Sequence, residues 1–454
     1  MAVGLLLISF PTLFSAEPKE MPSAANEKAE KIWGPTSREV LSLDLRECLQ
    51  RAMSFSRELQ TADQDILTAE EKGSEVRKIG FPILDYEYNL GPAPKDASNA
   101  TESFFSGDLT VFNRIRLGLG VPLQTFGKVK TGKQLSLLGI EAEKQKKVLK
   151  KSEIALKIHQ LYYGILLARE IRHLISMAND QLTKEIEKRE GKGGGDPTEL
   201  LKLKLFHAEL DRRAEESDKR EMMAREALRI LVDVDPLIRF DIKATRLLKV
   251  GRPLAPYDSY EKEAVGHRSD LKQLDIYYQV RERQVALEKR LPTPNLGIGA
   301  FFELGHAPGV HGLTTTDDFT DPFNFTRAGF GLRLTGQLDF HGSAAKIRQA
   351  RSELFKVEIQ RSLAREGALL DVKGAYLEVR NSQQEIDRAE EAGKLSRQLL
   401  FITQSNFDIG LSEGKEIIDA IQSFLETRGK YFEAVFNYDV SVAKLDQTIG
   451  RIPE

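Results

Sequence analysis

Four short segments of the sequence alternate between apolar positions and polar or glycine positions. They span residues 83–90, 113–123, 295–304 and 328–338. In the first segment Tyr86 lies between Asp85 and Glu87, and the same alternation runs through the other three. Because successive side chains of a strand point to opposite faces, each segment is predicted to be a β-strand with one apolar and one polar face. Segments 91–112 and 305–327, rich in Pro, Asn, Asp and Thr, are expected to join the strands in pairs.

Helical periodicity dominates the two long stretches of the chain that lack proline. They run from Pro122 to Pro197 and from Pro322 to Pro453, and both are rich in strong helix formers. Apolar and small residues recur at spacings of three and four, on more than one face. The first stretch carries them at Leu135, Leu138, Ala142, Leu149, Leu156, Tyr163 and Leu166. We therefore predict long coiled-coil helices that pack against neighbours on two sides.

The order of strands and helices occurs twice along the chain. Three pairs of landmarks are each separated by about 215 residues. The pairs are Pro82 and Pro294, Gly127 and Gly342, and Gly193 and Gly410. We expect repeat one at residues 42–232 and repeat two at 258–450, with a linker at 233–257.

Each predicted repeat has the same internal plan. It begins with a shorter amphipathic helix, at 42–81 or 258–291, which leads into the strands. A helix of about 100 Å follows, at 1.5 Å per residue, and ends at a glycine turn. The turns are expected near 191–199 and 407–416, each followed by a second helix. The fold class is therefore mixed and mainly α, with two internal repeats.

The N-terminus is the most apolar part of the chain. Residues 1–16 are expected to be a secretory signal peptide, and an apolar N-terminus that is not cleaved is the alternative. Residues 17–41 are polar, contain three prolines, and are expected to form a flexible extension.

Composition excludes several classes of protein. The 454 residues carry 66 basic and 68 acidic side chains, so that no global charge favours nucleic acid. The single cysteine, Cys48, excludes an intrachain disulfide framework and a cysteine-based metal cluster. No catalytic constellation stands out from the charged helix surfaces. We expect neither enzymatic activity nor a cofactor.

Two motifs resemble ligand sites but are better explained otherwise. Residues 127–134, GKVKTGKQ, nearly spell a phosphate-binding loop, but Gln134 replaces the hydroxyl that would hold Mg²⁺. A basic helix start explains this motif better. His306 and His311 share one loop without an acidic or cysteine partner at a ligand spacing, which favours a solvated loop over a metal site.

Residues 42–450 resemble the TolC family of outer-membrane efflux and secretion channels. The segment LSLDLRECLQRAMSFSREL is similar to the first helix of the family, and RLGLGVPLQTFGKV to its strand-to-helix junction. NFDIGLSEGKEIIDA resembles the periplasmic tip, with Phe407 before Gly410 and acidic residues at Glu416 and Asp419. GGGDPTELL matches the other tip less well.

The resemblance implies a homotrimer in the outer membrane of a diderm bacterium. Four strands cannot close a barrel, so that copies of the chain must share one. The resemblance alone specifies three copies: a twelve-stranded transmembrane β-barrel that continues into a periplasmic α-helical barrel. The implied function is a passive export duct of a tripartite efflux or type I secretion system. Its implied partners are a periplasmic adaptor and an inner-membrane transporter. A helical periplasmic scaffold or adaptor-like protein without a pore is the alternative.

The predicted functional residues lie at the two tips. Three copies of an inward carboxylate would form a ring of charge around the entrance. We expect the pore constriction to be formed by Glu416, Asp419, Glu199 and Phe407. The turns at Gly193 and Gly410 are expected to contact the adaptor.

Overall fold

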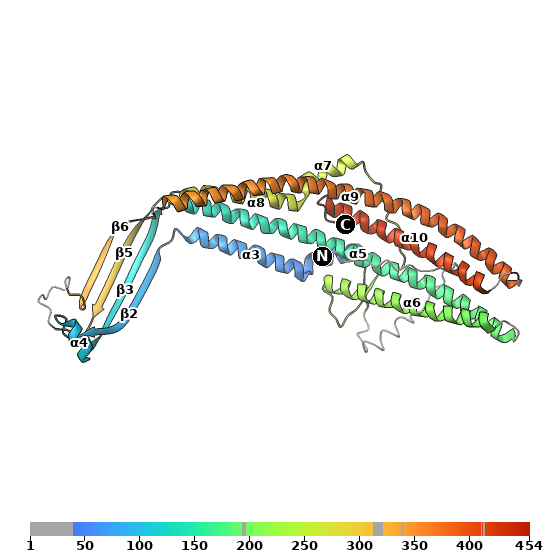
Figure 1. Cartoon of the computed structure of the whole chain (residues 1–454), viewed down its shortest axis with the longest axis horizontal. Helices are drawn as coiled ribbons and strands as arrows, with labels where there is room; N and C mark the ends of the chain where they lie inside the picture. The colour runs from blue at the N-terminus through green and yellow to red at the C-terminus, as the bar shows by residue number, and fades with distance from the viewer. Residues whose placement is uncertain (1–39, 193–196, 312–320, 338, 410, 412–413) are drawn as a thin grey trace. The chain divides into compact units, whose positions relative to one another are not determined.

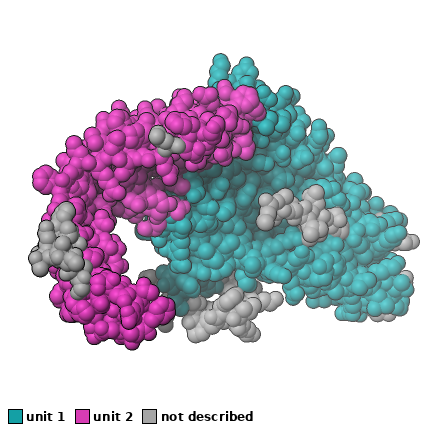
Figure 2. Space-filling model, turned by 60° about the vertical axis from the view of Figure 1, so that its left-hand side comes forward, with its two compact units in different colours: residues 1–63, 145–272, 362–454 teal, residues 64–144, 273–361 magenta. Residues whose placement is uncertain are grey.

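The computed structural model describes residues 40–192, 197–311, 321–337, 339–409, 411 and 414–454. The predicted signal peptide, nearly all of the predicted extension, and the turn residues Gly193 and Gly410 lie outside these ranges. The chain divides into two compact units (Figure 2). Unit 1 contains residues 1–63, 145–272 and 362–454, and unit 2 contains residues 64–144 and 273–361.

Helices with matched lengths make up most of the chain (Figure 1). In each half, a helix of 11 residues precedes one of 22, and a very long helix precedes one of 35. The first half contains α2 (Leu45–Phe55), α3 (Arg57–Lys78), α5 (Lys128–Lys192) and α6 (Pro197–Leu231). The second half contains α7 (Tyr257–His267), α8 (Ser269–Arg290), α9 (Phe340–Asp408) and α10 (Gly414–Thr448).

Two of the expected helices are divided in the structure. The expected helix at 42–81 is interrupted at Ser56, and that at 258–291 is interrupted at Arg268. Both residues adopt extended ψ values, 127° and 120°, which no α-helix accommodates. The N–H of each still bonds a carbonyl four residues earlier, of Ala52 or Ala264, so the turn closes before the chain bends.

The core of unit 1 lies between the long helices and their shorter partners. α10 contributes an apolar face along most of its length, from Ile417 to Leu445. α5 contributes fully buried Ile154, Ile158 and Ile165. Such burial is worth roughly 2 kcal/mol per side chain, which makes this packing the main source of stability in unit 1.

One strand of a small parallel ladder lies within the segment expected to be a linker. β4 (Arg239–Ile242) pairs in parallel with β1 (Val40–Leu43). Phe240 and Ile242 of β4 are buried, which fixes a segment that its prolines had suggested was free. The start of α2 is fixed beside it by a capping box, in which Asp44 and Glu47 exchange hydrogen bonds through their side chains and backbone N–H groups.

Unit 2 contains an antiparallel sheet of four strands in the order β2-β3-β5-β6. The strands are β2 (Ile83–Pro94), β3 (Leu109–Gln124), β5 (Asn295–His306) and β6 (Phe325–Thr335), and a short helix, α4 (Ala100–Ser106), lies in the β2–β3 connection. β3 is longer than expected. β6 begins and ends three residues before the expected bounds. Just after its end, Gly336 approaches Pro294 so closely that a Cβ added to the glycine would lie 3.1 Å from the Cα of Pro294.

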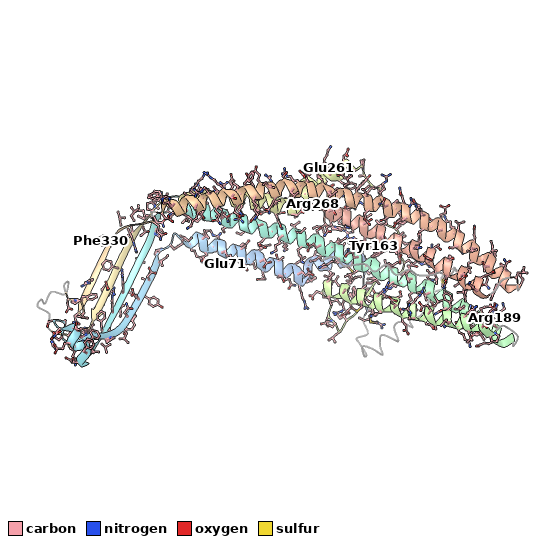
Figure 3. All side chains as sticks on the ribbon, in the orientation of Figure 1. Glu71, Tyr163, Arg189, Glu261, Arg268 and Phe330 are labelled. Atoms are coloured by element: carbon pink, nitrogen blue, oxygen red, sulfur yellow. The ribbon has the colours of Figure 1, made fainter. Side chains whose placement is uncertain are left out.

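The pairing register places most apolar positions on one face of this sheet and the Asp, Glu and Arg positions on the other, where Phe301 and Phe325 also lie. Tyr86 pairs with Leu117, Leu117 with Phe302, and Phe302 with Ala328. Phe330, also on the apolar face, is 90% exposed (Figure 3). A face this apolar is covered in a stable protein, by lipid or by another chain. Within the described residues, no helix combines the length and apolarity that crossing a bilayer requires.

Candidate functional site: the helix tips and the core of unit 1

The ends of three helices meet at Arg189, near the carboxyl end of α5 (Figure 3). Its guanidinium carbon lies 4.3 Å from the centroid of the Phe407 ring, near the end of α9. The same group forms ion pairs with Glu185 on its own helix and with Glu199 in the first turn of α6. One cation therefore connects the α5–α6 tip with the end of α9.

Glu199 extends this connection to the fourth helix end. Its carboxylate accepts a hydrogen bond of 2.9 Å from the backbone N–H of Gly414, the first residue of α10. Gly414 is buried, and an ideal Cβ there would lie 3.3 Å from Cδ of Glu199, tighter than ordinary contact. The absence of a side chain at Gly414 lets the carboxylate reach this N–H at the positive end of α10.

We name Arg189, Glu199, Phe407 and Gly414 the tip cluster. Two of its members, Glu199 and Phe407, were expected to line the pore constriction. Phe407 is only 5% exposed, and both residues contact their own chain. The sequence prediction missed Arg189 and Gly414. The one signal for Arg189 was a basic residue in the last turns of a long helix, ten positions before Glu199.

Glu416 and Asp419 lie on the opposite face of α10 from its buried residues. Both are exposed, whereas Ile417, Ala420 and Ile421 of the same two turns are buried. Among the described residues neither carboxylate has an ion pair. The two groups are one turn apart on a free face, an arrangement that allows both to point at the same space.

Exposed apolar residues lie within ten positions of tip-cluster residues along the same segments of the chain. They are Leu201, Leu205, Phe401, Ile402, Ile409 and Leu411. Ile409 and Leu411 flank the turn at Gly410, which itself lies outside the described residues. Exposed apolar side chains beside a helix turn are suited to contact another protein chain.

A buried ion network fixes β4 against α5 further along unit 1. Arg169 of α5 contacts Glu221 at 3.0 Å and also Asp241 of β4, and it donates to the carbonyl of Ala244 at 3.3 Å. Glu221 also accepts from Arg225 at 2.9 Å. Glu221 is almost fully buried. Removal of Arg169 would leave the negative charge of Glu221 paired with Arg225 but no longer with Arg169.

Asp439 of α10 is the most unusual titratable group of unit 1. It is 2% exposed, its Oδ1 accepts from the N–H of Val250 at 2.9 Å, and its buried Oδ2 has no partner among the described residues. Burial raises the pKa of Asp439 to about 7, although the N–H of Val250 and the charge of Lys249 act in the opposite direction.

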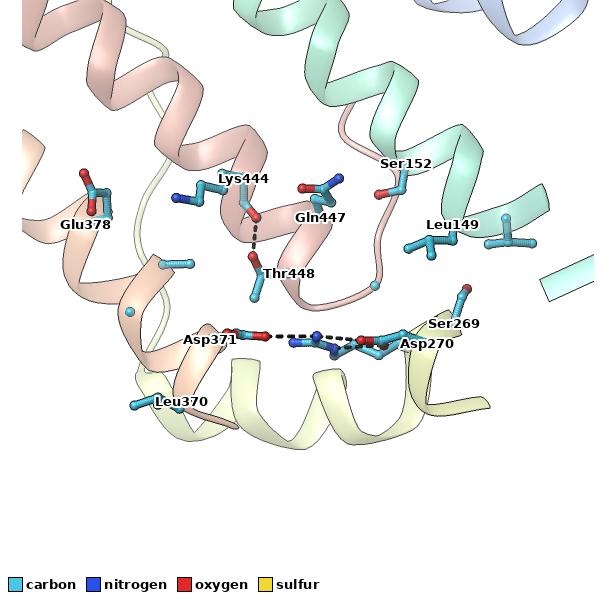
Figure 4. Close-up of a pocket in the computed structure, with 15 residues that line it drawn as sticks. Leu149, Ser152, Ser269, Asp270, Leu370, Asp371, Glu378, Lys444, Gln447 and Thr448 are labelled. Carbon is cyan, nitrogen blue, oxygen red and sulfur yellow. Dashed lines mark hydrogen bonds and ion pairs between the residues drawn. The ribbon is translucent and has the colours of Figure 1, made fainter. Parts of the chain in front are cut away.

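A cavity of about 490 Å³ opens between α5, α8, α9 and α10 (Figure 4). Arg268 crosses its floor between Asp270 and Asp371, with Nη2–Oδ2 distances of 2.7 and 3.2 Å. Its central charges thus compensate one another, and the lining provides no unpaired buried group for a ligand. The cavity is not a candidate active site.

The sequence motifs that resemble ligand sites have structural roles. Lys128 of the GKVKTGKQ segment contacts the carbonyl of Thr293 and Oδ1 of Asn295. The backbone N–H of His311 donates a hydrogen bond of 2.7 Å to the carbonyl of Lys95, the residue that follows β2. Across the described residues, no group of three or more His, Cys, Asp or Glu side chains is placed to hold a metal ion.

Comparison with protein families finds one match, in the second half of the chain. Residues 262–451 match the model of the outer membrane efflux protein family. No curated protein matches the sequence.

Solved structures match over nearly the whole chain. The outer membrane channel CmeC of Campylobacter jejuni has a TM-score of 0.73 at 15% identity, covering 97% of this chain and 94% of that one. VceC, an outer membrane protein of Vibrio cholerae, gives 0.69 at 16% identity over 90% and 97%. The open state of the MtrE outer membrane channel of Neisseria gonorrhoeae gives 0.68 at 14% identity over 98% and 99%. At these identities the matches establish the fold.

Proposed function

We propose that this chain, a TolC-family outer-membrane efflux protein by its family domain and its fold, assembles as a trimer that encloses a continuous export duct. The family domain and the fold support an outer-membrane channel of a tripartite efflux system, and such channels are not a kind of enzyme. Such channels work with an adaptor and an inner-membrane transporter. The alternative, a scaffold without a pore, has no support from the family domain.

The observation that carries the trimer proposal is the sheet of unit 2. Its edge strands, β2 and β6, have no strand beside them within the described chain, and one face is predominantly apolar. In a bilayer, each unpaired backbone group at such an edge would cost several kcal/mol. Pairing the edges of successive copies removes this cost, and three copies provide the twelve strands of a barrel wide enough for a lumen.

The tips are proposed to form the periplasmic entrance. Three copies of Glu416 and Asp419 would place six carboxylates around the axis, and a ring of this kind attracts cations. The tip cluster is proposed to hold the α5–α6 hairpin against the α9–α10 hairpin until an adaptor docks at the turns around Gly193 and Gly410. Through this cluster, Glu199 and Phe407 act on the aperture by positioning the helices that carry the ring.

Purification in detergent tests the proposal directly. The protein should run as a trimer in native mass spectrometry, and its mobility in SDS gels should change on heating. In planar bilayers it should form discrete conducting channels. A monodisperse monomer that is stable without detergent and does not conduct would refute the proposed function.

A further inference from the structure

Charges form a row across the polar face of the unit 2 sheet. Glu87 of β2 lies opposite Arg116 of β3, which lies opposite Glu303 of β5. Glu303 in turn lies opposite Arg327 of β6, and it also pairs with Arg114 at 2.5 Å. Each charge in this row therefore has an opposite charge on a neighbouring strand of the same chain.

Two charges on the same face lack such a neighbour. Asp85 on β2 lies opposite Gly118, and Arg333 on β6 lies opposite Gly297. Both side chains are exposed, and among the described residues neither forms an ion pair. They have opposite signs and lie on the two edge strands, near the strand ends that connect to the helices.

Backbone chemistry leaves the two edges ready to pair. The hydrogen bond from the Lys95 N–H to the Asp108 carbonyl, 3.1 Å, shows that odd-numbered residues of β2 direct their backbone groups toward β3. Even-numbered residues such as Tyr86 and Tyr88 therefore direct theirs to the free edge. Pro92 and Pro94 are also even-numbered. Because they lack an N–H on the side away from β3, they remove no hydrogen bond from the sheet of this chain.

The direction and faces of the strands restrict how two copies can join. Three antiparallel ladders separate β2 from β6, so that β6 of one copy meets β2 of the next in antiparallel fashion. Keeping both apolar faces on the same side permits only registers that pair odd with odd residues. The registers that remain differ from one another by shifts of two residues of β6 along β2.

We propose that β6 of one copy pairs with β2 of the next in the register that sets Arg333 opposite Asp85. This inference rests on the proposed trimer and adds its intersubunit register. In this register Thr335 meets Ile83 and Phe325 meets Ala93, so that all 11 residues of β6 find partners within β2. A shift of two in either direction loses the ion pair with Asp85 and shortens the ladder.

Barrel geometry agrees with this register. If the charged row continued directly from one copy into the next, Arg327 would lie opposite Glu87 of the next copy. The strands would then have no tilt relative to the barrel axis. The proposed register displaces each copy by about four residues, which in a barrel of twelve strands about 4.8 Å apart gives a tilt of roughly 35°. Barrels of this kind have tilts of about 35–45°.

Disulfide trapping tests the register in the full-length protein in its membrane. Arg333 and Asp85 would form a non-hydrogen-bonded pair with Cα atoms about 4.5 Å apart, a separation that a disulfide spans. Asp85→Cys with Arg333→Cys should give covalent trimers on non-reducing gels. Two control pairs, Glu87→Cys with Arg333→Cys and Asp85→Cys with Gly331→Cys, sample the registers two residues away and should crosslink at least tenfold less. Cys48 should not interfere, because it is fully buried and burial raises the pKa of its thiol to about 12.

The outcomes separate this inference from the proposed function. Trimers trapped best by a control pair, or trimers in native mass spectrometry that no pair traps, would overturn the register but leave the channel intact. Monomers in every variant and in the unmodified protein would refute the trimer itself.

Charge exchange provides an independent measurement. Asp85→Arg should lower the temperature at which the oligomer dissociates, by placing two cations opposite one another. Adding Arg333→Asp should restore it, because the ion pair is then re-formed with reversed polarity. Failure of the double variant to recover would contradict the pairing of these two residues.

Discussion

The guanidinium of Arg189 stacks on the ring of Phe407, although 218 residues of chain separate them. The contact joins the end of α5 to the end of α9, and Glu199 beside it binds the first N–H of α10. One arginine thus links the two helical hairpins at the end where the protein is proposed to open. Its removal is expected to affect gating more than folding.

Replacement of Arg189 by Ala should favour the open channel. The variant loses a cation–π contact worth about 1–2 kcal/mol and the ion pairs with Glu185 and Glu199, so that the open probability in planar bilayers should rise roughly tenfold. Arg189→Lys keeps the charge but not the planar stacking and should give an intermediate value. Arg212→Ala, which removes exposed pairs with Glu209 and Glu216 on α6, is the matched control. An open probability equal to that of the unmodified channel in Arg189→Ala would contradict a gating role.

Replacement of Glu416 and Asp419 together by Ala should reduce cation selectivity. Six carboxylates on a short length of pore attract cations, and multivalent cations added on the periplasmic side should block the unmodified channel. Reversal potentials in a salt gradient measure the first property, and current block measures the second. Ala at Glu358 and Glu378, exposed residues along α9, is the control. If the double variant keeps both properties, these carboxylates face away from the lumen.

Asp439 should make the folded state less stable as the pH rises. Its pKa is raised from 3.8 in the unfolded chain to about 7 in the folded protein, so that the folded state holds the proton more tightly. Protonated Asp439 therefore stabilises the folded state fully below about pH 4, and this stabilisation is lost as the pH rises through about 7. Its upper limit is roughly 4 kcal/mol.

Asp439→Asn tests this dependence, since the amide keeps the acceptor for the Val250 N–H and cannot ionise. The variant should unfold at a higher temperature than the unmodified protein at pH 8, and the difference should shrink at pH 5. Calorimetry in detergent measures both. A difference that does not vary with pH would argue against titration of Asp439.

Removal of Arg169 should destabilise unit 1 strongly. Arg169→Met leaves Glu221, which is nearly fully buried, with Arg225 as its remaining cation, and the free energy of unfolding should fall by about 3–5 kcal/mol. Arg220→Met removes an exposed pair with Glu216 and should change it by no more than about 1 kcal/mol. Urea unfolding followed by circular dichroism gives both values. Equal effects of the two variants would mean that the Arg169 network adds no stability beyond a surface pair.

The period of apolar residues was sufficient to predict which segments are strands and which are long helices. The alternation around Tyr86 specified a strand because side-chain direction within a strand depends only on the local backbone. The interruptions at Ser56 and Arg268 could not be predicted in this way, since neither position carries proline or glycine and the break depends on the ψ angle of one residue. The strand β4 was missed because Pro236 and Pro253 suggested a linker, whereas its partner, β1, lies about 200 residues earlier.

The sequence by itself determined the two faces of the sheet, the long helices and the likeness between the halves of the chain, because each follows from neighbours along the chain. It also placed Glu416 and Asp419 on one face of a helix. Only the tertiary structure decided that Glu199 and Phe407 meet Arg189, that Gly414 must lack a side chain, and that Asp85 and Arg333 face glycines. These relationships join residues up to 218 positions apart, and they depend on how helices and strands pack side by side, which local periodicity does not encode.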